Sequence, residues 1–458
     1  MNCSERGRVA GAGPWAGVWW KKGVLWAVAC GMATSAAAVG LQEARTTALA
    51  RHPDAALADN GVRAAAADLQ AAGQRPNPAL SVQTVNINPS RGIGSGPPTR
   101  QYVDTTVGLT WLVERGGKRD LRVAGGEARQ AAARADRAET LRQLRLTVDW
   151  AYFDLKRAQD RLLLVDAALA LQQRGYEIAE RRLRAGDLAA VEVARLQVEL
   201  ARAQAERAQA VADRTLAQRA LAAAMGLDGP PAAARDLSAD DDYPAVPAEA
   251  SADATTRAPA AEVSPVLRLD AIDTAAVAAP IDSRPDVIAA QRRVEAARAQ
   301  RELAEATTRR DVTVGVSAER YPPDNRGSLG VGVSVPLFWR HAFEGERRRA
   351  EADAEAAELL LRRQRQQAER EQRQADDQLQ AARTRLRTLE GPAQQAAQRA
   401  LAGIELAYAR GAAALTDVLD ARRQLHALQL DLADARAAHA KALALWQANA
   451  VAGVTAAP

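Results

Sequence analysis

Alternating apolar and polar positions predict four β-strands. Over residues 311–320 and 328–338, valine and leucine alternate with threonine, serine and glycine. Residues 102–113 follow the same pattern, and residues 79–87 follow it less cleanly. Alternation over about ten residues is typical of strands that span an outer membrane, and it also fits a strand with one exposed face in a soluble sheet. The pattern alone leaves both interpretations open.

The residues around these strands favour a membrane location. The segments that connect the strands within each pair are polar and contain glycine and proline, as expected of exposed turns. Aromatic residues near strand ends are expected where a barrel meets lipid headgroups. The aromatic residues in such positions are Tyr102, Trp111, Tyr321, Phe338 and Trp339.

Apolar residues at spacings of three, four and seven predict long helices. No proline interrupts residues 118–184, where leucine and valine recur at helical spacing. At 1.5 Å per residue, such a helix is roughly 100 Å long. Heptad-like spacing of Val418, Leu425 and Leu432 predicts another long helix. Because helices of this length do not fit inside a compact domain, we expect coiled-coil partners along them.

An internal repeat organises these elements. Residues 51–66 resemble residues 283–298, and residues 183–200 resemble residues 409–425. Each copy contains a helix, two strands, a very long helical segment, a glycine and another long helix. The predicted boundaries are a first repeat at 39–228, an irregular connector rich in Pro, Ala and Asp at 229–282, a second repeat at 283–450 and a tail at 451–458.

A signal peptide is predicted over residues 1–38. Lys21 and Lys22 precede a short apolar run and then small residues, which is the order found in secretory leaders. The apolar run is too short to span a bilayer as a helix. Cleavage after Ala38 would leave a chain without cysteine, which suits an oxidising periplasm. Lipid attachment at Cys30 is the alternative.

Composition and charge argue against two other classes of protein. Aromatic residues make up only 4% of the chain and alanine dominates its apolar residues, which favours long, closely packed helices. The 61 basic and 56 acidic residues alternate along helical stretches, as on solvated helix faces rather than nucleic-acid-binding surfaces. The four histidines are scattered without metal-ligand spacing. We therefore predict no enzymatic activity, no cofactor and no metal site.

Four membrane strands from one chain cannot close a barrel. Single-chain barrels begin at about eight strands, and an open sheet edge in lipid would leave backbone groups unpaired. The strands must therefore be pooled between chains. Closure predicts an oligomer but does not fix the number of subunits.

Three segments together resemble the TolC family of outer-membrane efflux proteins. They are "SRPDVIAAQRRVEAA" at 283–297, "VGVSVPLF" at 331–338 and the glycine followed by "TDVLDAR" at 411–422. The strand-to-helix segments 114–128 and 336–356 more closely resemble the heavy-metal, CzcC-like branch. The resemblance implies a mainly α-helical fold with a membrane β portion. In that fold a homotrimer forms a twelve-stranded outer-membrane β-barrel, continued by a periplasmic α-helical barrel.

The resemblance also implies a function. Such a trimer is the outer-membrane channel of a tripartite efflux system in a Gram-negative bacterium. It is a passive conduit that exports substrate, here heavy-metal cations or drugs. The implied partners are a periplasmic adaptor, an inner-membrane pump of the RND type and outer-membrane lipid, but not nucleic acid. The alternative is a soluble periplasmic coiled-coil or adaptor-type structural protein. Two similar strand pairs, each feeding a long helix, favour the channel.

By the same resemblance, two turns at the periplasmic end of the tunnel carry the candidate site. Gly186 and Gly411 end long helices where the chain turns back, and glycine suits such a turn because it accepts a positive φ. Arg184 and Arg410 lie beside them in the segments that would contact the adaptor. The residues implied at the pore entrance and its gate are Asp417, Asp420, Glu192 and Tyr408.

Carboxylates suit an entrance of this kind. Rings of them at a constriction attract cations and raise the barrier to anions. Asp417 also lies near a helix start, where it could cap the helix, and the two roles are compatible. The sequence departs from the family at one point, because Ala413 stands where TolC has an arginine that helps hold its channel closed. Either Arg410 or Arg422 replaces that arginine, or the tip rests in a looser state.

Overall fold

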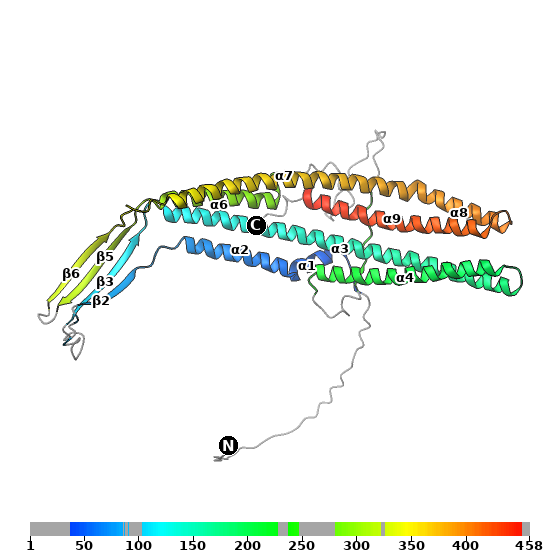
Figure 1. The fold of residues 1–458 in the computed structure, drawn as a ribbon, viewed down its shortest axis with the longest axis horizontal. Coiled ribbons are helices and arrows are strands. Elements are labelled where there is room, and N and C mark those ends of the chain that lie inside the picture. Colours follow the sequence, from blue (N-terminus) through cyan, green and yellow to red (C-terminus); the bar gives the residue numbers. More distant parts are fainter. Residues whose placement is uncertain are drawn as a thin grey trace, which may run out of the picture. The chain divides into compact units, whose positions relative to one another are not determined.

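A computed structural model describes residues 37–85, 87, 90, 103–227, 237–246, 280–321 and 326–450. Helices predominate, and four longer strands form one sheet (Figure 1). Cys30, most of the expected signal peptide, Tyr102, most of the connector and the C-terminal tail lie outside the described residues.

The sheet is antiparallel and has the strand order β2-β3-β5-β6. The first copy supplies the strands β2 (Ala79–Val85) and β3 (Asp104–Val113). The second copy supplies β5 (Val312–Tyr321) and β6 (Arg326–Ser334). The two copies meet where β3 pairs with β5. β6 ends at Ser334, whereas the alternation of side chains predicted a strand as far as residue 338.

Strand register sorts the side chains of this sheet onto two unlike faces. One row across the four strands is Leu80, Leu109, Val316 and Val331. The adjacent row, on the opposite face, is Ser81, Gly108, Ser317 and Gly330. The apolar face is largely uncovered in the single chain, since Leu329 and Val331 are 89% and 80% exposed. The sheet therefore has an exposed apolar face and a face of small, mostly polar residues.

The first copy forms four helices, of which one is very long and packs against others of its own copy. They are α1 (Leu41–Arg51), α2 (Pro53–Ala72), α3 (Lys118–Arg184) and α4 (Ala190–Ala224). α3 packs against α2 and α4 of its own copy and against α6 and α9 of the second. Its buried core includes Val148, Tyr152 and Leu155, which cluster with Leu221 of α4. The uninterrupted helical pattern over 118–184 thus becomes a single helix of 67 residues.

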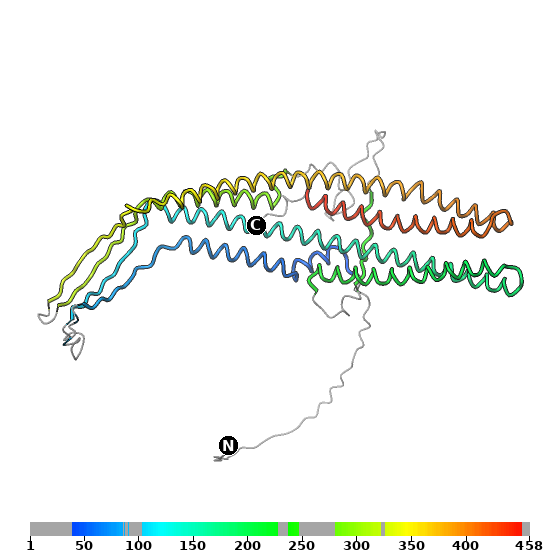
Figure 2. The backbone as a smooth tube through the Cα atoms, viewed as in Figure 1, coloured from blue at the N-terminus to red at the C-terminus, as the bar shows by residue number. Residues whose placement is uncertain are grey.

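The second copy has a matching series of helices with one interruption. Its helices are α6 (Pro285–Ala306), α7 (Glu344–Thr388), α8 (Gln394–Ala409) and α9 (Leu415–Ala450). A π-helical segment, Leu389–Ala393, joins α7 to α8 and contains Pro392. Figure 2 traces α3–α4 and α8–α9 as two helical hairpins, each closed by a short turn.

A second, very small sheet ties the start of the first repeat to the connector. β1 (Ala37–Val39) pairs in parallel with β4 (Leu237–Ala239). β4 is a regular element within residues 229–282, where the composition predicted only an irregular connector. β1 in turn spans the predicted leader boundary, so cleavage after Ala38 would divide that strand.

Candidate functional site

The two helical hairpins end in the same type of turn. Gly186 has φ +82° and Gly411 has φ +76°, the left-handed region that glycine adopts without strain. In the first turn, the N–H of Gly186 donates to the carbonyl of Leu183 and that of Asp187 donates to Arg182. In the second turn, the N–H groups of Gly411 and Ala412 donate to Tyr408 and Ala407 in the same way. Both helices thus end in a Schellman motif, with glycine directly after the cap residue.

Glu192 and Asp417 occupy equivalent positions after these turns. Each is the third residue of its helix, α4 and α9 respectively. An Oδ2 atom of Asp417 accepts a hydrogen bond of 3.0 Å from the N–H of Ala414, which immediately precedes α9. The side chain of Asp417 is exposed, and that of Glu192 is half-buried. Asp417 therefore closes the helix start while keeping its carboxylate accessible to solvent.

Asp420 is paired with a cation on its own helix. Its carboxylate lies 3.1 Å from a guanidinium nitrogen of Arg423, one turn further along α9. The same arginine reaches Glu199 of α4 at 3.8 Å. A chain of alternating charges thus runs from the second hairpin to the first near their turns.

A groove between α8 and α9 brings the two predicted aspartates together. Its volume is about 400 Å³. The lining residues are mostly small: Ala397, Ala400, Ile404, Ala413, Asp417, Asp420, Ala421 and Gln424. The groove can accept a narrow apolar segment beside two carboxylates. Glu192 and Tyr408 do not line it.

The remaining predicted residues lie around the turns. Arg184 is exposed, with its guanidinium 3.8 Å from Glu180 on its own helix. Arg410 is exposed and caps α8, and Tyr408 is half-buried one residue before the end of α8. Arg422, one candidate for the missing latch, donates 2.7 and 3.1 Å hydrogen bonds to Glu405. These bonds join α8 to α9 within one hairpin and do not link the two hairpins.

Sequence reasoning missed the contacts that do link the hairpins. Besides Arg423 and Glu199, they include His426 of α9, which lies 3.7 Å from Glu206 of α4. The signal was present in the repeat, because Arg423 and Glu199 lie almost equally far beyond Gly411 and Gly186. An alignment of the two copies places these opposite charges at nearly equivalent positions on α9 and α4, where two parallel hairpins could bring them into contact.

Among the residues that the structure describes, no three His, Cys, Asp or Glu side chains lie close enough to hold a metal. Within the same residues, no helix combines the length and apolar character needed to cross a bilayer. The turns present charged side chains and the groove between α8 and α9.

Comparison with known proteins identifies the family. Residues 44–227 and 279–447 match the family model described as outer membrane efflux protein. The chain belongs to the outer membrane efflux protein family. The two matched blocks coincide with the two copies of the repeat and skip most of the connector. Membership assigns the chain to the outer membrane of Gram-negative bacteria, with its helices in a periplasmic tunnel.

Individual relatives agree with this membership. The cobalt-zinc-cadmium resistance protein CzcC of Cupriavidus metallidurans is 25% identical over 328 residues, which cover 71% of this chain and 72% of CzcC. The outer membrane protein VceC of Vibrio cholerae has a similar fold, with a TM-score of 0.68 and 23% identity, over 90% of this chain and 96% of VceC. The Campylobacter jejuni CmeC outer membrane channel gives a TM-score of 0.71 at 15% identity, over 90% and 86% of the two chains. The predicted TolC-type fold is thus confirmed, and the soluble coiled-coil alternative is set aside.

Proposed function

We propose that this efflux protein is the outer-membrane conduit of a tripartite system, that it acts as a homotrimer, and that its cargo is heavy-metal cations. A periplasmic adaptor and an inner-membrane pump of the RND type complete the system. The observation that carries the oligomer is the unfinished sheet, and the family resemblance supplies the number three. Within the described residues, β2 pairs only with β3 and β6 pairs only with β5, so each outer strand keeps one free edge.

The faces of the sheet support the same conclusion. Lipid cannot satisfy free backbone groups, so both edges need strands from other chains. Closing the sheet with its apolar face outward exposes Leu80, Val331 and their neighbours to lipid and turns the serine and glycine row inward. Three chains supply twelve strands, a number within the range of known barrels.

The carboxylates at the hairpin turns support a cation cargo. Asp417 is exposed, and the described ion pairs include none to its carboxylate, whereas Asp420 is matched by Arg423. In a trimer the unmatched acid occurs three times around one axis and attracts cations to the entrance. The 25% identity to a protein named for cobalt, zinc and cadmium resistance points to the same cargo.

The first test is the state of the protein in membranes. The molar mass of tagged protein extracted from fractionated membranes is measured by light scattering with detergent correction. A particle of three chains from the outer-membrane fraction supports the proposal. A monomer from the soluble periplasm overturns it.

The second test addresses cargo. Survival on cobalt, zinc and cadmium and survival on drugs are measured in a strain deleted for the gene and in the same strain with the gene returned. If the deletion strain loses metal resistance but keeps drug resistance, and the returned gene restores the loss, the result supports a metal conduit. The reverse result rejects it. Asp417→Asn with Asp420→Asn is expected to lower the cation preference of reconstituted channels. The matched exposed substitution Asp68→Asn on α2 leaves that preference unchanged.

A further inference from the structure

Apolar alternation continues beyond the last hydrogen-bonded residue of β6. Val335, Leu337 and Trp339 have the same parity as Val331 and Val333 on the apolar face. They are 40%, 56% and 83% exposed. A largely exposed tryptophan at the end of such a row is typical of the boundary between lipid tails and headgroups.

Positively charged residues begin at Arg340, directly after Trp339. Residues 340–349 contain four arginines and two glutamates. Two of these arginines have weak partners of opposite charge. Arg348 lies 3.8 Å from Glu344 and Arg349 lies 3.8 Å from Asp353, with all four side chains at least 65% exposed. Exposed pairs at that distance contribute little. The described contacts include no partner for the guanidinium of Arg340. This stretch therefore offers guanidinium groups to an outside anion.

A cluster of aromatic rings fixes the backbone at this point. The rings of Phe338 and Phe343 meet edge to face at 5.0 Å between centroids, and the ring of His341 lies 4.6 Å from that of Phe343. Arg310 covers Phe338 at 5.7 Å. Phe343 has φ +56°, a strained value for a residue with a Cβ, and it is the one such non-glycine residue among those described. The packed rings hold the chain in that conformation.

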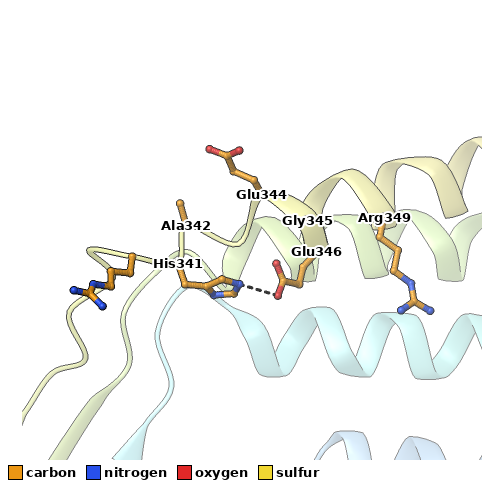
Figure 3. Close-up of a pocket in the computed structure, with 7 residues that line it drawn as sticks. His341, Ala342, Glu344, Gly345, Glu346 and Arg349 are labelled. Carbon is orange, nitrogen blue, oxygen red and sulfur yellow. Dashed lines mark ion pairs between the residues drawn. The ribbon is translucent and has the colours of Figure 1, made fainter.

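The bent chain borders an open cavity of about 630 Å³, lined by Arg340, His341, Ala342, Glu344, Gly345, Glu346 and Arg349. Figure 3 shows His341 and Glu346 pointing toward each other, and their ion-pair distance is 3.2 Å. Glu344 points away from this pair in the same view. The acid nearest the histidine is thus engaged, which leaves Arg340 and Arg349 as the cationic groups of the lining.

We propose that this cavity binds the phosphate headgroup of an anionic phospholipid in the inner leaflet of the outer membrane. The inference rests on the proposed function, because only a sheet embedded in that membrane brings Trp339 to the headgroups. Arginine suits phosphate because its planar fork can donate two parallel hydrogen bonds. The apolar row supplies the surface for the acyl chains, and Arg340 follows it directly.

At the equivalent junction of the first copy, two cations are already bonded within the chain. There the ammonium of Lys118 is buried and donates to the carbonyl of Arg309 and to both oxygens of Asp311, each at 2.8 Å. Arg122 is held by Glu114 through hydrogen bonds of 2.6 and 2.9 Å. Cations that are already bonded within the chain are not available to lipid. We therefore expect one headgroup site in each subunit.

Lipid binding to the full-length protein tests the proposal. Native mass spectrometry in neutral detergent measures the affinity for phosphatidylglycerol and for phosphatidylcholine. The test variant is Arg340→Gln with Arg349→Gln. The control is Arg115→Gln with Arg363→Gln, which removes the same charge at two exposed positions away from the cavity. The wild type and the control are expected to prefer phosphatidylglycerol, and the test variant to bind it roughly fivefold more weakly for each arginine lost.

Two results would overturn the site. One is equal phosphatidylglycerol affinity in all three proteins. The other is displacement of the lipid by inorganic phosphate at similar concentration, which would mean that the cavity recognises a free anion. The same preparations are checked for location and mass. A three-chain outer-membrane particle without lipid preference contradicts the headgroup site alone. A soluble monomer contradicts the proposed function as well.

Discussion

The two copies of the repeat span almost the same length of helix between sheet and turn, but they build it differently. In the first copy α3 runs unbroken for 67 residues. In the second, α7 has 45 residues, the π-helical segment 5 and α8 16. Pro392 explains the break, because proline lacks the N–H that an α-helix needs and its ring clashes with the preceding turn. A π-helical turn relieves this conflict without ending the helix.

The junctions between helix and sheet also differ between the two copies. The first is locked by the buried Lys118 and by Asp311. Burial raises the pKa of Asp311, but the hydrogen bond from Lys118 and other favourable contacts outweigh burial and leave that pKa below its ordinary value. The second junction relies on half-buried phenylalanine rings and one exposed ion pair, His341 with Glu346. The first copy thus has the unbroken helix and the buried ion pair, whereas the second has the interrupted helix and the exposed ion pair.

The largest expected effect comes from the first junction. Lys118→Met leaves Asp311 without its ammonium partner and should lower stability by about 3 kcal/mol, the scale for breaking a mostly buried ion pair. His341→Gln in the second junction removes an exposed pair and should change stability by less than about 0.5 kcal/mol. Thermal unfolding of the detergent-solubilised protein measures both. Equal losses would contradict the contrast between the junctions.

Proline tolerance should separate the two long helical paths. Ala167→Pro on the exposed face of α3 removes a helix hydrogen bond and should cost about 3 kcal/mol. Pro392→Ala acts where the backbone already accommodates proline and should shift stability by less than about 1 kcal/mol in either direction. Helical circular dichroism during thermal melting reports both changes. If α3 accepts proline without loss, it is not the stiffer path.

The two turns should respond alike, because they share one motif. Gly186→Ala and Gly411→Ala each place a Cβ at positive φ and should cost about 1 kcal/mol. Gly403→Ala within α8 is the control, since its surroundings are open and its φ is not positive, and it should stabilise the protein by about 0.5–1 kcal/mol. Thermal midpoints measured side by side distinguish the signs. A stabilising change at either turn would contradict the assigned motif.

A pH-dependent effect concerns a buried histidine of the second copy. Burial lowers the pKa of His439, Arg383 and Arg387 of α7 lower it further, and Glu390 raises it. The unfolded chain therefore binds the proton more readily, so stability should fall as the pH drops below about 6.5, by at most about 1.4 kcal/mol per pH unit. Unfolding midpoints from pH 8 to pH 5 measure the slope. His439→Gln should flatten it, and an unchanged slope would assign the effect to other groups.

Features set by local physics were open to prediction from sequence. The long helix of the first copy follows from an apolar pattern without proline, and the turns follow from glycines that must take positive φ. The end of β6 was misjudged because alternation records which face meets an apolar surface, and it continues to Trp339 after the hydrogen bonds stop at Ser334. Pairings between distant segments leave no trace in a local pattern. The parallel contact of β1 with β4 is one example, and the ion pair of Arg423 with Glu199 could be predicted only by comparing the two copies of the repeat.

The row of Ser81, Gly108, Ser317 and Gly330 has a consequence for the rate of passage. Replacing a hydrogen of Gly330 by a methyl group would place the carbon 2.6 Å from the hydroxyl oxygen of Ser317. The side chains of this row therefore leave no room for a larger residue at Gly330. When three such sheets enclose a lumen, no long side chain from this row narrows the bore. At the level of this row, such a barrel would be wide, and resistance to flow and discrimination among solutes would belong to other parts of the path.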